Sequence, residues 1–140
     1  MTVSAQEYSG SPAGIVEKEP VLGLLLRGSS LTRRQLEALF LEAEDYALGR
    51  RRTFEEKARL LGVSRGTYAR ILGQALRNVS QSLYTLLLLG YLGMLGERRF
   101  SWLMELGRAL EDGEMEEALE MLVQLAKKSM PRPQPPQPSP

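Results

Sequence analysis

The sequence contains no cysteine and no histidine. Their absence excludes disulfide bonds, thiol catalysis, histidine acid–base chemistry and the usual zinc sites. A metal site made of carboxylates alone stays possible in principle, but no clustered spacing indicates one, and we expect neither a metal nor another cofactor. No nucleophile, base and orienting residue are spaced as a catalytic triad, and no glycine-rich phosphate loop is present. We therefore do not expect an enzyme.

Membrane and export signals are also missing from the sequence. The first ten residues lack a basic segment followed by an apolar one, so they do not form a secretory signal. The longest uncharged run, residues 78–96, holds three glycines and several polar residues and does not predict a membrane span. We expect a cytoplasmic protein that binds no membrane. Arginine far outnumbers lysine and asparagine occurs once, which hints at a thermophilic organism.

The charge is small overall but unevenly distributed. The 140 residues carry a net charge of +1. Residues 50–77 hold eight basic and two acidic residues, whereas residues 96–126 hold three basic and eight acidic ones. Such asymmetry favours a polyanion-binding segment and a separate acidic module. The alternative is that both segments are simply solvated helix faces.

Residues 53–77 predict two short helices joined by a turn. Thr53 and Glu56 have the spacing of a capping box, and Gly62 is a residue on which a helix often ends. Ser64 is a second N-cap candidate, after which Tyr68, Ile71, Leu72 and Ala75 recur at helical spacing. A turn of about three residues between two helices is typical of a helix-turn-helix, whose second helix lies in the DNA major groove.

The segments LGVSRGTYARIL and RNVSQSL, with LTRRQLEAL upstream, resemble the helix-turn-helix of sigma-factor region 4. The similarity extends to small predicted prokaryotic DNA-binding proteins and to the C-terminal domain of the archaeal bacterio-opsin activator family. It covers roughly residues 31–83 and implies a transcription regulator. The sequence departs from the pattern at Gly66 and Gly73, within the second helix of the motif.

The remaining segments also predict helices. In residues 31–48, Thr32 and Gln35 form a capping box, the apolar face is expected to contain Leu36, Leu39, Phe40, Ala43 and Ala47, and the wet face Glu37, Glu42, Glu44 and Asp45. The helix after Ser64 should continue as one long helix to about Leu89, where Gly90, Gly93 and Gly96 either end it or form a small-residue stripe. Residues 100–110 and 115–126 predict a helical hairpin with a turn at Asp112-Gly113. Residues 15–27 fit either a short buried strand or a short helix.

These elements predict an all-α fold, in which a three-helix core with the helix-turn-helix is followed by a long connecting helix and a C-terminal hairpin. The expected division is a disordered N-terminus at residues 1–14, a DNA-binding domain at 15–83, a helical association module at 84–128 and a proline-rich disordered tail at 129–140.

The side chains expected to touch double-stranded DNA follow from the inward-facing residues of the second helix. Candidates for base contact are Arg65, Ala69, Arg70 and Gln74, since arginine can bond guanine O6 and N7 together. Candidates for phosphate contact are Arg50, Arg51, Arg52, Arg59, Ser64, Thr67 and Arg77. Gly66, Ala69 and Gly73 form a small-residue stripe that suits either close approach to the groove or close packing on another helix.

The sequence thus favours a sequence-specific transcription regulator. One recognition helix reads only a few base pairs, so we expect a homodimer, formed through residues 83–126, on an inverted repeat. The alternative function is an adaptor that binds a subunit of the transcription machinery through its helical surfaces.

Overall fold

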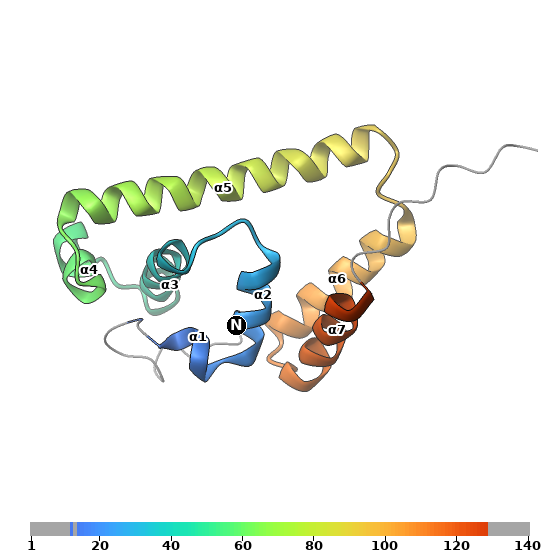
Figure 1. Ribbon diagram of the computed structural model, residues 1–140, viewed down its shortest axis with the longest axis horizontal. Coiled ribbons are helices and arrows are strands. Elements are labelled where there is room, and N and C mark those ends of the chain that lie inside the picture. The colour runs from blue at the N-terminus through green and yellow to red at the C-terminus, as the bar shows by residue number, and fades with distance from the viewer. Residues whose placement is uncertain (1–11, 13, 129–140) are drawn as a thin grey trace, which may run out of the picture.

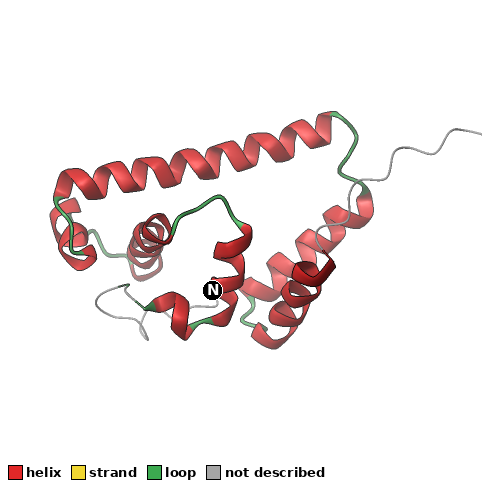
Figure 2. Cartoon of the chain, in the orientation of Figure 1, coloured by secondary structure: helices red, strands yellow, loops and turns green. Residues whose placement is uncertain are grey.

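The computed structural model describes residue 12 and residues 14–128. The described chain is entirely helical and contains no strand (Figures 1 and 2), which confirms the predicted all-α class. The predicted disordered segments, residues 1–14 and 129–140, lie outside the described residues except for Pro12 and Gly14. The helices are α1 (Ile15–Lys18), α2 (Pro20–Gly28), α3 (Arg33–Leu48), α4 (Phe54–Leu61), α5 (Arg65–Tyr91), α6 (Glu97–Glu111) and α7 (Met115–Lys128).

The helix ends follow local sequence signals. Both predicted capping boxes form, from Thr32 with Gln35 at the start of α3 and from Thr53 with Glu56 at the start of α4. In each box the side-chain oxygen accepts a backbone N–H that the helix itself leaves without a partner. Gly49 and Gly62 end α3 and α4 in the left-handed conformation, with φ of 64° and 73°, which glycine adopts without steric cost.

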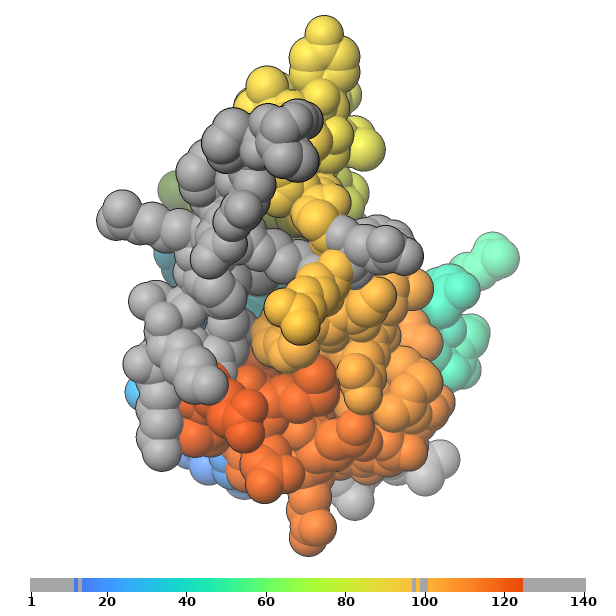
Figure 3. Space-filling view, turned by 90° about the vertical axis from the view of Figure 1, so that its right-hand side faces the viewer, coloured from blue at the N-terminus to red at the C-terminus, as the bar shows by residue number. Residues whose placement is uncertain are grey.

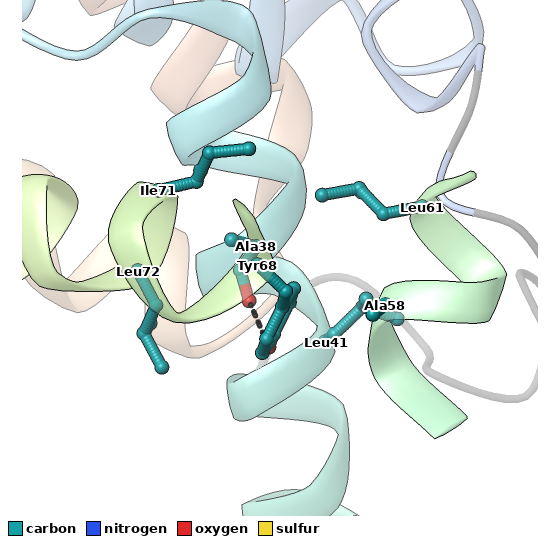
Figure 4. Packing of buried hydrophobic residues seen from close by; sticks show 7 residues of the cluster. All are labelled: Ala38, Leu41, Ala58, Leu61, Tyr68, Ile71 and Leu72. Carbon is teal, nitrogen blue, oxygen red and sulfur yellow. Dashed lines mark hydrogen bonds between the residues drawn. The ribbon is translucent and has the colours of Figure 1, made fainter. Parts of the chain in front are cut away.

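Helices α3, α4 and α5 enclose the first hydrophobic core (Figure 4). Tyr68 of α5 lies at its centre, fully buried, and its hydroxyl donates to the Glu42 carboxylate at 2.7 Å. Burial and this hydrogen bond raise the pKa of Tyr68 well above its usual value, so the phenol stays neutral. The side chains packed around it come from all three helices and are Ala38, Leu41, Ala58, Leu61, Ile71 and Leu72.

The inward face of α3 differs from the predicted one. Ala38 and Leu41 are buried, whereas Ala43 and Ala47 are exposed. Of the residues expected on the wet face, Glu37, Glu44 and Asp45 are buried and Glu42 is half-buried. The prediction for this face was wrong because it assumed that carboxylate side chains face solvent. A carboxylate can be buried where cations from another element pair with it.

Those cations come from the loop before α4 and from α4 itself. The guanidinium nitrogens of Arg52 lie 2.9 Å from a carboxylate oxygen of Glu44 and 2.6 Å from one of Asp45. The ammonium nitrogen of Lys57 lies 2.9 Å from a carboxylate oxygen of Glu42 and 3.0 Å from one of Asp45. Burial opposes the ionisation of Asp45, but hydrogen bonds and charge from Lys57 and Arg52 outweigh it and lower the pKa of Asp45. This buried ion cluster therefore joins the second half of α3 to the start of α4.

A second hydrophobic core lies between α2, α6 and α7. Val21 of α2 is buried together with Leu106 and Ala109 of α6 and with Ala118 and Leu122 of α7. The uncertain segment around VLGLLLRG is thus a helix, and it packs on the C-terminal hairpin. The predicted hairpin and its turn form, with Gly113 left-handed at φ 76°, but α6 begins at Glu97, three residues before the predicted start. The two hydrophobic cores therefore do not coincide with the predicted domains. Helix α2 was expected in the DNA-binding domain with α3–α5, but its apolar side chains pack on α6 and α7.

Helix α5 connects the two halves of the molecule. It runs from Arg65 to Tyr91, close to the predicted single long helix, and Gly93 follows its end in the left-handed conformation at φ 71°. Its N-terminal half covers α3 and α4, while its C-terminal half extends along the top of the molecule in Figure 1. Seen from the side, the yellow end of α5 projects above the hairpin (Figure 3).

Candidate nucleic-acid interface

The start of α5 is held rigidly against α3 and α4. Arg34 of α3 donates to the carbonyl oxygen of Leu61 at 2.9 Å, which satisfies a backbone acceptor at the C-terminal end of α4. Gly62 then reverses the chain, and the Ser64 hydroxyl accepts the Thr67 amide at the start of α5. Two helices joined by a turn of residues 62–64 therefore pack on each other and on a third helix.

The inward residues of α5 agree with the sequence prediction. Tyr68, Ile71, Leu72 and Ala75 are all buried. With 3.6 residues per turn, the opposite side of the helix carries Gly66, Arg70, Gly73 and Arg77 in one line. We call these four residues the outer strip.

The outer strip is open along its length. A Cβ atom built on Gly66 would meet no atom within 4 Å, and one built on Gly73 would meet only the Arg77 guanidinium at 4.0 Å. Neighbouring Ala69 is exposed as well. The small-residue stripe thus does not pack on another helix among the described residues, and glycine inside a helix costs about 1 kcal/mol relative to alanine. The fold itself gives no packing reason for Gly73.

The predicted base-contact residues lie on or beside the outer strip. Arg65, Ala69 and Arg70 are exposed, and Gln74 is half-buried at its edge. Within the described residues neither Arg65 nor Arg70 forms a salt bridge. Both guanidinium groups therefore keep their donors available for a ligand.

The predicted phosphate-contact residues fall into two groups. Arg51, Arg59 and Arg77 are exposed and form no salt bridge with the described residues. Arg50 is half exposed but lies 3.2 Å from Glu44, and only 13% of the Arg52 side chain is exposed because it sits in the buried ion cluster. The adjacent arginines 50, 51 and 52 thus do not form one patch, and only Arg51 points freely to solvent.

The two hydroxyl candidates are engaged with each other. Ser64 donates to the Thr67 hydroxyl at 2.9 Å and also caps the Thr67 amide. They thus fix the start of the helix that carries the outer strip. Both residues lie at the N-terminal end of α5, where backbone amides without a helical partner can bind an anion. Ser64 is exposed there and Thr67 is half-buried.

Sequence reasoning missed the positioning role of Glu44, Asp45 and Lys57, which together with Arg52 hold α4 against α3. The sequence does contain a signal for this cluster. Two carboxylates lie near the end of α3, and the turn at Gly49 brings the cations that follow it back toward them. Within residues 14–128 no cluster of acidic residues could hold a metal ion, and no helix is long and apolar enough to cross a membrane.

Comparison of the chain with known protein families, with curated proteins and with solved structures finds no match. The assignment of a role to the outer strip therefore depends on its geometry and chemistry.

Proposed function

We propose that the protein is a sequence-specific DNA-binding transcription regulator in which α4 and α5 act as a helix-turn-helix. The observation that carries the proposal is the outer strip. Two arginines that form no salt bridge with the described residues alternate with two open glycines along the N-terminal half of a helix that a three-helix core holds in place. A helix with this exposure can enter the major groove, where arginine reads guanine.

Two further exposed arginines, Arg51 and Arg59, lie on the neighbouring loop and helix and form no salt bridge with the described residues. Arg51 precedes α4, Arg59 lies near the end of α4, and Arg77 ends the strip on α5. In the proposed complex these three bind phosphates and set the position of the helix, while Arg70, with Arg65 beside it, contacts base edges. Arg52 has no part in DNA contact, because its guanidinium is committed to Glu44 and Asp45.

The division between reading and anchoring predicts different results for two arginine variants. Arg70→Ala should cost about 1–3 kcal/mol on the preferred site and relax the preference at one base pair. Arg51→Ala should weaken binding to all sequences about equally. Selection from randomised duplexes measures both, and an Arg70→Ala protein that selects the wild-type site would show that another residue reads the base.

Close approach of α5 to the groove predicts opposite effects of one substitution on stability and on binding. Gly73→Ala should stabilise the protein by about 0.5–1 kcal/mol, because alanine favours a helix and its Cβ meets no backbone. The same methyl group should lower affinity for the preferred DNA site by about tenfold, equivalent to about 1.4 kcal/mol. Thermal unfolding and a gel-shift titration measure the two effects.

Gly107→Ala is the matched control, since Gly107 lies inside α6 and its Cβ, like that of Gly73, would meet no backbone atom within 4 Å. It should stabilise the protein to a similar extent and leave DNA affinity unchanged. Equal affinities of the Gly73→Ala and wild-type proteins would mean that the outer strip does not approach the groove floor.

The adaptor alternative is separated from this proposal by a gel shift with duplex DNA at low salt. DNA binding supports the regulator. A protein that binds no duplex under these conditions would leave the outer strip as a surface for another protein.

A further inference from the structure

The C-terminal half of α5 carries a broad apolar surface that the rest of the described chain leaves uncovered. Six large side chains expose more than half of their area, from 52% for Leu76, just before the midpoint of α5, to 88% for Tyr91 at its end. The other four are Leu83, Tyr84, Leu87 and Leu88. Contiguous apolar patches of this kind on a soluble chain mark sites of association.

The exposed residues lie on neighbouring sides of the helix. Leu76, Leu83, Leu87 and Tyr91 are separated by seven, four and four positions, which places them along one side, and Tyr84 and Leu88 flank them. No charged residue occurs between Asn78 and Gly96. A helix that is apolar over so much of its circumference is expected to be buried against another element.

The C-terminal hairpin does not supply that element. Its own apolar face is already covered, because Leu106, Ala109, Ala118 and Leu122 pack with Val21 of α2. Helix α5 packs on α3 and α4 through its N-terminal half and makes no comparable contact with the hairpin among the described residues. Beside the helix, Val79 and Leu83 line a shallow hollow of about 320 Å³ that remains open.

We infer that a second copy of the chain covers this surface, so that two α5 helices pair through their C-terminal halves. Tyr84 and Tyr91, exposed by 72% and 88%, alone leave on the order of 300 Å² uncovered, since an aromatic side chain buries about 150–250 Å². With the leucines beside them the surface approaches the ~800 Å² that each partner gives to a stable interface.

The absence of charge on this surface also favours a second copy of the chain as its partner. It bears no charge that a partner of opposite charge would match, and two identical uncharged faces meet without repulsion. A patch that pairs with itself across a two-fold axis is the commonest form of assembly in soluble proteins. Of the predicted dimer region, residues 83–126, we therefore assign the contact to the C-terminal half of α5. The apolar face of the hairpin takes no part, because it packs on α2.

This pairing deepens the proposed function, because it supplies two recognition helices, but its argument and its test do not depend on DNA. Sedimentation velocity of the full chain at micromolar concentration, without DNA, should show a dimer. Leu83→Glu combined with Leu87→Glu should raise the dissociation constant at least about a hundredfold and yield a monomer. Both side chains are exposed, so circular dichroism should show unchanged helix content.

Met104→Glu is the control, since Met104 is 58% exposed on α6 of the hairpin. This variant should remain a dimer. A monomeric wild-type chain, a dimeric double-glutamate variant or a monomeric Met104→Glu variant would each overturn the inference. Among these, a wild-type monomer that sediments with uncharged phospholipid vesicles would assign the surface to lipid.

A second measurement covers the case in which the double variant loses its fold. The chain has no cysteine, so Leu83→Cys places one thiol per copy near the middle of the surface. Mild oxidation should link most of this protein into covalent dimers. Tyr46→Cys, at a residue 91% exposed on α3, should stay uncoupled, and equal crosslinking of the two variants would contradict the pairing.

Discussion

Replacing Arg52 with methionine is expected to destabilise the protein by about 3–5 kcal/mol, a large part of the ~5–15 kcal/mol that holds a domain folded. Methionine keeps an apolar stem of similar shape but removes the guanidinium. Among the described cations, the Glu44 side chain, 0% exposed, would then keep only the half-exposed Arg50 at 3.2 Å, and Asp45 would keep only Lys57. Urea unfolding followed by circular dichroism measures the loss.

Arg51→Met is the control for this experiment, because Arg51 is adjacent in the chain but exposed and without a salt bridge to the described residues. Its effect on the free energy of unfolding should stay within about 0.5 kcal/mol, as is usual for surface substitutions. Similar unfolding curves for the two variants would show that the buried ion cluster does not depend on Arg52.

Raising the salt concentration from 50 to 200 mM is expected to lower the affinity for duplex DNA by roughly a thousandfold. A pair of chains that each place Arg51, Arg59 and Arg77 on phosphates makes about six such contacts, and each contact adds ~0.9 to the slope of log affinity against log salt. Fluorescence anisotropy with a labelled duplex gives this slope.

Arg77→Ala should flatten that slope by about 1.8, because the proposed pair loses one phosphate contact from each copy. Arg108→Ala provides the comparison, since Arg108 lies on the acidic hairpin within 3.1 Å of Asp112 and 3.4 Å of Glu114. It should leave the slope unchanged. Affinity that does not vary with salt, or an unchanged slope for Arg77→Ala, would argue against the assigned phosphate contacts.

The candidate site illustrates which parts of an interface local pattern can predict. The inward residues Tyr68, Ile71, Leu72 and Ala75 follow from helical spacing, and all four are buried. Once they are placed, Arg70 must point outward, since it lies on the opposite side of the same helix. The exposure of the outer strip was therefore predictable without any tertiary contact.

Arg52 shows where local pattern fails. Three adjacent arginines in a loop look equivalent in the sequence, but only 13% of the Arg52 side chain is exposed. Its role depends on Glu44 and Asp45, which lie on another element and were themselves expected to face water. The charge pattern of one helix cannot show that its carboxylates are buried. A buried ion pair is recognised only when the positions of both partners in the fold are known.

The sequence by itself determined where the helices from α3 onward lie and where α3 and α4 end, because capping residues, left-handed glycines and apolar spacing act within a few residues of each other. The start of α6 at Glu97, which has no side-chain cap, was predicted three residues too late. Only the tertiary structure decided which face of α3 turns inward, where α2 packs, and which part of α5 stays uncovered. Val21 packs with Leu106 and Leu122, which are far from it in the sequence. Arg52 pairs with carboxylates of α3 that lie on the other side of the turn at Gly49. Such contacts depend on how elements distant in sequence are arranged in space, and local spacing does not encode that arrangement.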